Sequence, residues 1–212
     1  MERRSELSLL DAAAELSAYD EYPVLLAEID PQLHLSRNDR DQPFFLICDH
    51  DTVLIQMAGT SRVRMMSSPV LWEVLELGDF LYVPARTPHR IEILEPSVHV
   101  RFKAAKPAVE GVAWFCDNCA SEVHRIEFDV TEEQLVQDGY VAACAVFNSD
   151  ATLRTCDNCE TVHEPVDLTG IRWQETAELI RTAAGAAEQR PHATGTVAAR
   201  SSSGAGAWAQ SS

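Results

Sequence analysis

The chain has 212 residues, of which 46% are hydrophobic, so it can bury one large core or a medium domain joined to a small one. Its 33 acidic and 17 basic residues give a formal charge of −16, and no basic patch offsets it, which argues against nucleic-acid partners and anionic lipid. No apolar run approaches the roughly 20 residues that cross a bilayer, and we expect a cytoplasmic protein without a membrane partner.

The first 105 residues predict a short helix followed by a β-rich domain. Leucine and alanine residues recur at helical spacing from Ser5 to Ala18, which predicts an amphipathic N-terminal helix within residues 1–19. Residues 20–105 contain short apolar runs separated by turn residues, and many short strands at near-regular spacing are typical of an antiparallel barrel or jelly roll. The expected strands are Val24–Ile29, Phe44–Cys48, Thr52–Met57, Ser61–Met66, Val70–Leu75, Phe80–Val83, Arg90–Ile93 and Ser97–Phe102.

The second half of the chain predicts a small module, a helix and a tail. Lys103 to Gly111 has the composition of a linker, and residues 106–168 form the expected module with a strand at Glu122–Val130. A helix is expected at Trp173–Glu188, within residues 169–190. Residues 191–212 are small and polar, which predicts a flexible tail.

Four of the six cysteines form two identical Cys-Asp-Asn-Cys turns: Cys116, Cys119, Cys156 and Cys159. Each turn offers two thiolates, and two facing turns make a tetrahedral four-thiolate site that zinc and iron both accept. Such a site has no open position, so we expect a structural metal rather than a catalytic one. A redox dithiol and plain buried cysteines are the alternatives, but neither requires two matched pairs. Cys48 and Cys144 are expected to be isolated core thiols.

A family resemblance rests on Gly78–His89, Trp114–Cys119 and Cys156–Pro165. The first stretch resembles the second cupin motif, whose histidine binds a metal. Together the three stretches resemble the bacterial 3-hydroxyanthranilate 3,4-dioxygenases, which join a cupin barrel with a non-haem Fe(II) site to a rubredoxin-like four-cysteine iron site. The resemblance implies a mainly β fold, a cupin (double-stranded β-helix or jelly-roll) barrel with a small rubredoxin-like module and flanking helices, and it implies a homodimer.

The resemblance also implies that most of the catalytic iron ligands are missing. The family holds its iron with two histidines and a glutamate, of which only the second histidine is matched, by His89. The glutamate position is occupied by Thr52, and the loop that carries the first histidine is deleted. The family's substrate-binding arginine and glutamate correspond to Ile93 and Arg101. A single imidazole cannot hold Fe(II) open to oxygen and a catechol-like chelate, so we expect iron-dependent ring cleavage to be lost.

Strand alternation suggests which side chains could replace the lost site. His50 shares a face with Thr52, and His99 shares one with Arg101. With His89, the three histidines could bind a second metal or act as acid and base, and Arg101 could bind a substrate carboxylate. The alternative is that His50 is simply solvated and His99 is a hydrogen-bonded core residue. The remaining histidines are expected at the surface or in support of the fold: His34, His124, His163 and His192.

Three functions therefore stay open. The first is a divergent enzyme that acts on a small aromatic or amino-acid-derived carboxylate without the Fe(II) ring-cleavage site. The second is a non-catalytic cupin that binds or senses a small molecule. The third is a 3-hydroxyanthranilate-type dioxygenase that uses unusual ligands.

Overall fold

The computed structural model describes residues 8–16, 19, 21–26, 28–67, 71–106, 108–131 and 134–188. The start of the helix expected from Ser5 and the tail expected at residues 191–212 lie outside this part of the chain. No described helix is both long and apolar enough to cross a membrane.

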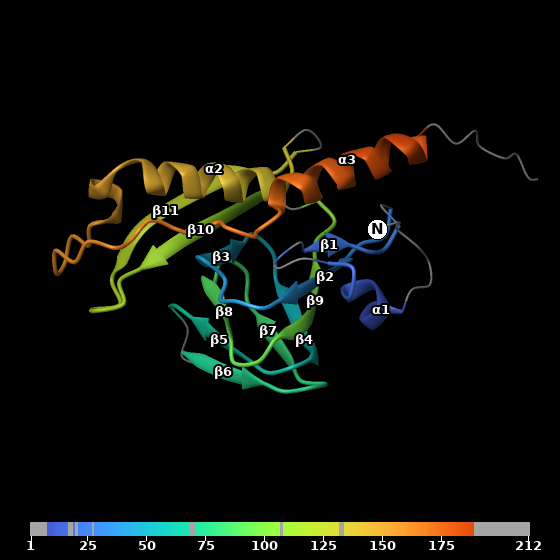
Figure 1. The fold of residues 1–212 in the computed structure, drawn as a ribbon, viewed down its shortest axis with the longest axis horizontal. Helices are drawn as coiled ribbons and strands as arrows, with labels where there is room; N and C mark the ends of the chain where they lie inside the picture. Colours follow the sequence, from blue (N-terminus) through green and yellow to red (C-terminus); the bar gives the residue numbers. More distant parts are fainter. Residues whose placement is uncertain are drawn as a thin grey trace, which may run out of the picture.

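Two antiparallel sheets face each other and form the barrel (Figure 1). One sheet has the order β1-β2-β9-β4-β7 and the other the order β11-β10-β3-β8-β5-β6. The expected mainly β, two-sheet cupin-like fold is confirmed. The strands are β1 (Tyr22–Pro23), β2 (Gln32–Asn38), β3 (Phe45–Cys48), β4 (Thr52–Ala58), β5 (Ser61–Met65), β6 (Trp72–Leu75), β7 (Phe80–Val83), β8 (His89–Ile93), β9 (Ser97–Lys103), β10 (Val109–Phe115) and β11 (Glu122–Asp129).

Helices cover one end of the barrel and the extension made by β10 and β11 (Figure 1). These helices are α2 (Val136–Ser149) and α3 (Trp173–Glu188), while the short α1 (Leu9–Ala13) lies beside β2. The helix α2 packs so closely on β11 that a Cβ atom at Gly139 would lie 2.1 Å from the Phe128 ring. Glycine at the fourth residue of this helix therefore leaves room for the Phe128 ring, although glycine has a low helix propensity. The core beneath α2 includes Phe44, Val112 and Phe147.

Seven of the eight strands expected in the first half are confirmed, and so is the helix Trp173–Glu188. The strand expected at Val24–Ile29 is wrong, and β2 forms after it instead. The expected linker Lys103–Gly111 is shorter than predicted, since β10 begins at Val109. The helix α2 was not predicted at all.

The strand β2 was missed because the barrel is polar inside and apolar outside at this point. Leu33 and Leu35 pack outward in a cluster with the buried face of α1. The alternate residues of β2 are polar, and they pair in register with the alternate polar residues of β9, so that His34 lies opposite Arg101. In a typical half-buried strand, the apolar side chains face the core and the polar ones face solvent. In β2 the apolar face is covered by a helix on the outside, and the polar face points into the barrel.

Candidate functional site

The barrel interior is built around alternate residues of β9. Ser97, His99, Arg101 and Lys103 are all buried, each at 3% exposure or less. The residues between them face the opposite side, as the two-residue repeat of a strand requires. The strand therefore delivers a row of polar and charged groups into the barrel, next to His89 at the start of β8.

His89 presents one nitrogen to the barrel interior. Its Nδ1 lies 3.0 Å from the carbonyl oxygen of Thr87 and donates a hydrogen bond to it. The lone pair is therefore on Nε2, and the Nη1 group of Arg101 contacts this atom. Burial, aided by the charge of Arg101, lowers the pKa of His89 to about 3, so the imidazole is neutral near pH 7. The tautomer is the one that would suit a metal ligand, but a guanidinium N–H occupies the lone pair.

Arg101 is also held by a carboxylate. Its Nε atom lies 3.1 Å from Oε1 of Glu21, and both side chains are largely buried. Burial opposes ionisation of Glu21, but Lys103 and Arg101 outweigh it and lower the pKa of that carboxyl. The guanidinium is thus held between an imidazole acceptor and a carboxylate.

A second buried pair of a basic and an acidic side chain lies in the barrel. Lys103 Nζ lies 2.9 Å from Glu110 Oε1, with both residues at 3% exposure or less. Burial disfavours the ammonium, yet Glu110 and Glu21 raise the pKa of Lys103 above its usual range. Tyr140 donates a hydrogen bond from α2 to Glu110 over 3.4 Å. Burial raises the pKa of Glu110, and Lys103 opposes this shift. Two basic side chains therefore lie next to two acidic ones inside the barrel.

His99 belongs to a separate hydrogen-bonded chain. Asn38 Nδ2 lies 2.7 Å from its Nδ1, and Ser61 Oγ lies 2.9 Å from its Nε2. Ser61 donates in turn to Gln56 Oε1 over 2.7 Å. Burial lowers the pKa of His99 to about 3, so this ring is also neutral. His99 has the geometry expected of a hydrogen-bonded core histidine.

The three candidate histidines are not brought together. His50 is exposed in the turn between β3 and β4, whereas His89 and His99 are both fully buried. Among the described residues, the single group of three or more histidine, cysteine or acidic side chains placed to share a metal is the four cysteines. At the glutamate position, Thr52 is 2% exposed and its Oγ1 has no hydrogen-bond partner. These residues do not fit a 2-His-1-carboxylate iron.

The cavity beside Arg101 is small. It has a volume of about 20 Å³, and Tyr140 of α2 and Trp173 of α3 are among the residues that line it. Trp173 is fixed there, since its Nε1 donates to the carbonyl oxygen of Tyr19 over 2.9 Å. A space of this size holds about one water molecule, which is far less than a carboxylic acid needs.

The four-cysteine site has the geometry of a tetrahedral metal centre. The Sγ atoms of Cys116 and Cys159 are 3.5 Å apart, as are those of Cys119 and Cys156. All four sulfur atoms lie within 4.8 Å of one another. A tetrahedron with metal–sulfur bonds of about 2.3 Å has sulfur–sulfur edges of about 3.8 Å, so these residues fit zinc or iron.

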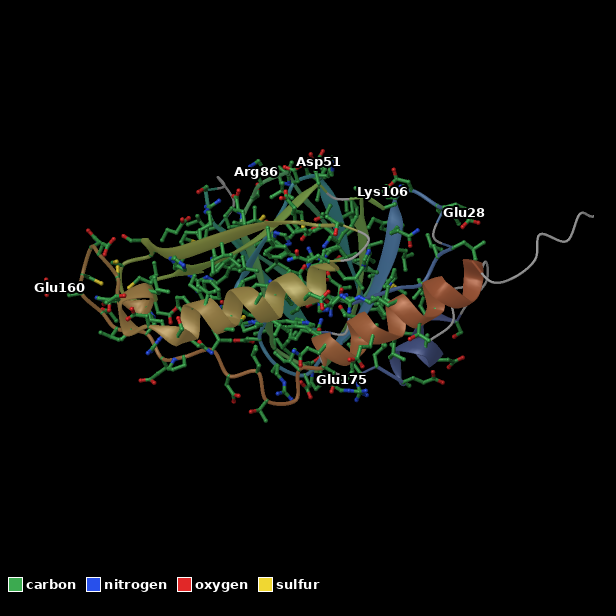
Figure 2. All side chains as sticks on the ribbon, turned by 90° about the horizontal axis from the view of Figure 1, so that it is seen from above. Glu28, Asp51, Arg86, Lys106, Glu160 and Glu175 are labelled. Atoms are coloured by element: carbon green, nitrogen blue, oxygen red, sulfur yellow. The ribbon has the colours of Figure 1, made fainter. Side chains whose placement is uncertain are left out.

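The two cysteine turns have the same backbone structure. The amides of Ala120 and Glu160 each donate to the carbonyl of the first cysteine of their turn over 2.8 Å. Both residues have left-handed backbones, with φ of 59° and 58°. Figure 2 shows Glu160 at one far end of the molecule, well away from Lys106 and Glu28 near the barrel. The site therefore lies at a distance from the polar core.

The sequence pointed to the four cysteines, which the structure groups, and to His89 and Arg101, which it places in contact. It did not reveal the carboxylates that pair with Arg101 and Lys103. Glu21 precedes the barrel and Glu110 lies in the expected linker, so neither fell on a recognised motif. Burial of these carboxylates depends on long-range packing. The only local sign was the charged residue Lys103 at the end of an otherwise barrel-like strand.

The sequence is similar to several curated 3-hydroxyanthranilate 3,4-dioxygenases. It is 31% identical over 129 residues to that of Brucella anthropi, covering 59% of this chain and 66% of the relative. It is 30% identical over 121 residues to that of Bacillus thuringiensis, covering 54% and 65%. It is 26% identical over 111 residues to that of Candida albicans, covering 51% and 63%. The chain is thus a distant homologue of these proteins and spans just under two thirds of their length.

The barrel region is matched by one protein-family model and aligns with two solved structures. Residues 47–112 match the JmjC domain family. A hydroquinone 1,2-dioxygenase in complex with Cd²⁺ and 4-hydroxybenzonitrile aligns with a TM-score of 0.41 and 18% identity, over 49% of this chain and 82% of that one. A cupin-2 domain protein from Shewanella frigidimarina aligns with a TM-score of 0.39 and 18% identity, over 46% and 93%.

Proposed function

We propose that this chain is a 3-hydroxyanthranilate dioxygenase-like cupin that does not cleave aromatic rings and serves as a metal-stabilised binding protein. The observation that carries the proposal is the contact between Arg101 Nη1 and His89 Nε2. This contact occupies the lone pair of His89 Nε2, which the family resemblance assigns to iron. The side chain that makes this contact is itself a cation.

A guanidinium replaces the charge of a metal but not its chemistry. An iron that activates dioxygen must offer open coordination positions to the gas and to the chelating substrate. A guanidinium offers only N–H donors in a fixed plane, and it has no accessible redox state. Arg101 can therefore stabilise the barrel, but it cannot bind oxygen.

The buried ion pairs also weigh against a carboxylate substrate at Arg101. Such a substrate would have to displace Glu21, which lies 3.1 Å from Arg101 Nε, and enter a cavity of about 20 Å³. Displacing Glu21 would leave a buried carboxylate without its partner, which is strongly unfavourable. The enzyme hypothesis built on His89 and Arg101 is thus the less favoured one, and a binding role is preferred.

The four-cysteine site supports a structural role for a bound metal. Four thiolates complete the shell of zinc or iron and leave no position for substrate. Such a metal would fix the two cysteine turns relative to each other. We propose one structural metal per chain.

We expect iron-loaded protein to show no oxygen uptake when 3-hydroxyanthranilate is added. The measurement uses an oxygen electrode, with the Brucella anthropi relative loaded and assayed in parallel to show that the iron and the substrate are competent. Oxygen consumption that depends on both iron and 3-hydroxyanthranilate would contradict the proposed function.

A further inference from the structure

The sheet β1-β2-β9-β4-β7 turns an apolar face to the outside of the barrel. Side chains alternate along its strands, so the residues between the inward-facing ones point outward. On β4, β7 and β9, all in the described part of the chain, these outward residues include no charged side chain. They form the surface that we call the apolar strip: Val53, Ile55, Met57, Phe80, Tyr82, Val98, Val100 and Phe102. An antiparallel sheet usually turns polar residues to solvent, so this strip calls for a cover.

The helix α1 covers only one side of the apolar strip. Ala12 and Ala13 of this helix belong to the same buried cluster as Val100 of β9, at the centre of the sheet. On β7, at the margin of the sheet, Phe80 is 70% exposed and Tyr82 is 51% exposed. Large apolar side chains that lie exposed on one continuous apolar face mark a surface that contacts another molecule.

The strand β7 also has an open edge, since it is the last strand of its sheet. The Gln56 amide of β4 donates to the carbonyl oxygen of Asp79 over 2.9 Å. In steps of two along this antiparallel pair, Leu81 also faces β4, so the backbone groups of Phe80 and Tyr82 point to the open edge. An apolar edge strand without lysine or proline is a template for pairing with another strand.

The carboxylates at the two ends of β7 are held by local hydrogen bonds. Asp79 Oδ2 accepts from the Glu76 amide over 2.9 Å, and Asp51 Oδ1 accepts from the Ala85 amide over 2.8 Å. Asp51 also accepts from the Tyr82 hydroxyl, which raises the pKa of Tyr82 above its usual value. These bonds hold both carboxylates at the ends of the strand and fix the tyrosine ring on the apolar strip.

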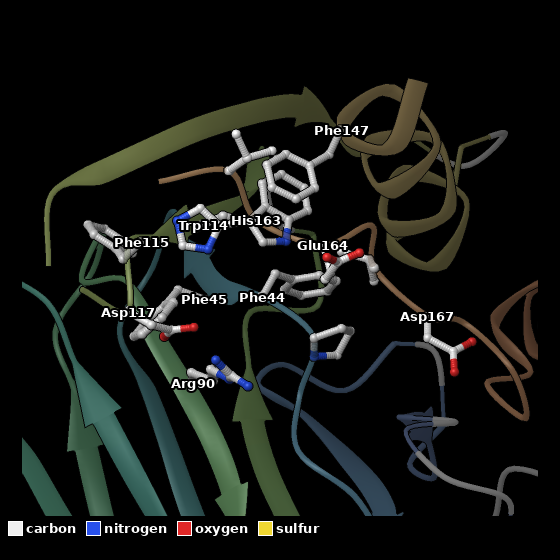
Figure 3. A pocket seen from close by; sticks show the side chains of 13 residues that line it. Phe44, Phe45, Arg90, Trp114, Phe115, Asp117, Phe147, His163, Glu164 and Asp167 are labelled. Atoms are coloured by element: carbon white, nitrogen blue, oxygen red, sulfur yellow. The ribbon is translucent and has the colours of Figure 1, made fainter. Parts of the chain in front are cut away.

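Charge decides which partner the apolar strip fits. The cleft of about 450 Å³ beside the second cysteine turn is lined by charges of both signs, on Arg90, Asp117, Glu164 and Asp167 (Figure 3). The apolar strip offers no such group to a charged partner. Two copies of this chain repel each other, because each carries a formal charge of −16, so they can meet only where neither presents a carboxylate. The strip meets this condition, and the interfaces of homodimers are typically apolar and poor in charge.

We propose that a second copy of this chain docks on the apolar strip, with β7 of one protomer antiparallel to β7 of its partner. A two-fold axis relates two antiparallel edge strands, so the same surface serves both protomers. Phe80 and Tyr82 of each protomer lie at the centre of the contact, and the free backbone groups of the two edges pair across it. The contact goes beyond the proposed function and uses neither the barrel interior nor the cysteine site.

Sedimentation equilibrium of the metal-loaded full chain at low and high sodium chloride tests this proposal. The wild type should be a dimer whose Kd falls as salt is added, because salt screens the repulsion between the two acidic protomers. A contact held by ion pairs would weaken instead. Phe80→Lys should raise the Kd about a hundredfold or more, since the apolar contact is lost twice in a symmetric dimer. This variant is less acidic than the wild type, so added repulsion between whole chains cannot cause the loss.

Leu179→Lys is the matched control, because Leu179 is 50% exposed but lies on α3, and it should dimerise as the wild type does. Thermal unfolding and metal content establish that each variant is folded, and Tyr82→Lys replaces Phe80→Lys if the latter is not. The proposal is overturned if the wild type stays monomeric up to millimolar concentration, if the folded Phe80 variant dimerises equally well, or if salt weakens the dimer. It is also overturned if the wild type stays monomeric and binds neutral phosphatidylcholine vesicles through Phe80. Oxygen uptake in the earlier assay would contradict the proposed function but not this contact.

Discussion

Replacing Cys116 and Cys119 together by serine should release the bound metal and lower the thermal midpoint of the full chain on the order of 10 °C or more. Serine hydroxyls do not replace thiolates as ligands for zinc or iron in such a site. Structural zinc contributes about 10 to 16 kcal/mol to the folding of zinc-finger peptides, and part of a contribution of this size would be lost here. Differential scanning calorimetry with metal analysis measures both effects.

The large effect is expected because the second cysteine turn lies in a segment with little regular secondary structure. Residues 151–167 contain one short 3₁₀ helix and a single isolated bridge, between Thr155 and Val162. Cys144→Ala is the control, since Cys144 is a buried thiol in the core beneath α2 and is not one of the four. It should keep the metal. A wild-type chain whose midpoint is unchanged by a strong chelator would contradict this prediction.

The second large effect is expected from Glu21→Gln. Removing this carboxylate leaves the buried Arg101 guanidinium without its anion, and breaking a buried ion pair typically lowers the free energy of unfolding by about 3 to 5 kcal/mol. Urea unfolding of the metal-loaded protein measures the difference. The loss in free energy of unfolding should be far larger than the loss of one hydrogen bond would cause, because the neutral amide leaves the charge of Arg101 uncompensated in the barrel.

Two further variants separate this electrostatic cause from a general loss of packing. Glu122→Gln breaks a shorter ion pair, with Arg125 at 2.6 Å, but both of these side chains are more than 30% exposed. It should lower stability by less than about 1 kcal/mol. The double variant Glu21→Leu with Arg101→Leu should be more stable than Arg101→Leu alone, since it leaves no unpaired charge. Equal losses in Glu21→Gln and Glu122→Gln would count against a charge-paired core.

The sequence predicted the local features of this fold well because they have local causes. The strands around Gly78–His89 follow from alternation and turn residues, and the cysteine turns follow from their spacing. The strand β2 could not be recognised, because its polar face points into the barrel. The helix α2 was missed, and its fourth residue, Gly139, has a low helix propensity and leaves room for the Phe128 ring instead.

The candidate site was predicted only in part, for a related reason. Strand alternation places His99 and Arg101 on the same face of the strand, and both side chains are buried in the structure. It does not reveal that His99 is bonded to Asn38, or that Arg101 faces Glu21, since those partners are 61 and 80 residues away in the chain. His50 was placed by alternation continued into a turn, where strand alternation no longer applies, and it is exposed.

The most direct test of the account is the metal content of the wild type beside His89→Ala and Cys116→Ser/Cys119→Ser after loading with Fe(II) or Zn²⁺ and removal of excess. The account predicts one metal per chain in the wild type and in His89→Ala, and none in the cysteine variant, because Arg101 occupies the lone pair of His89. A second tightly bound ion that is lost in His89→Ala would contradict it.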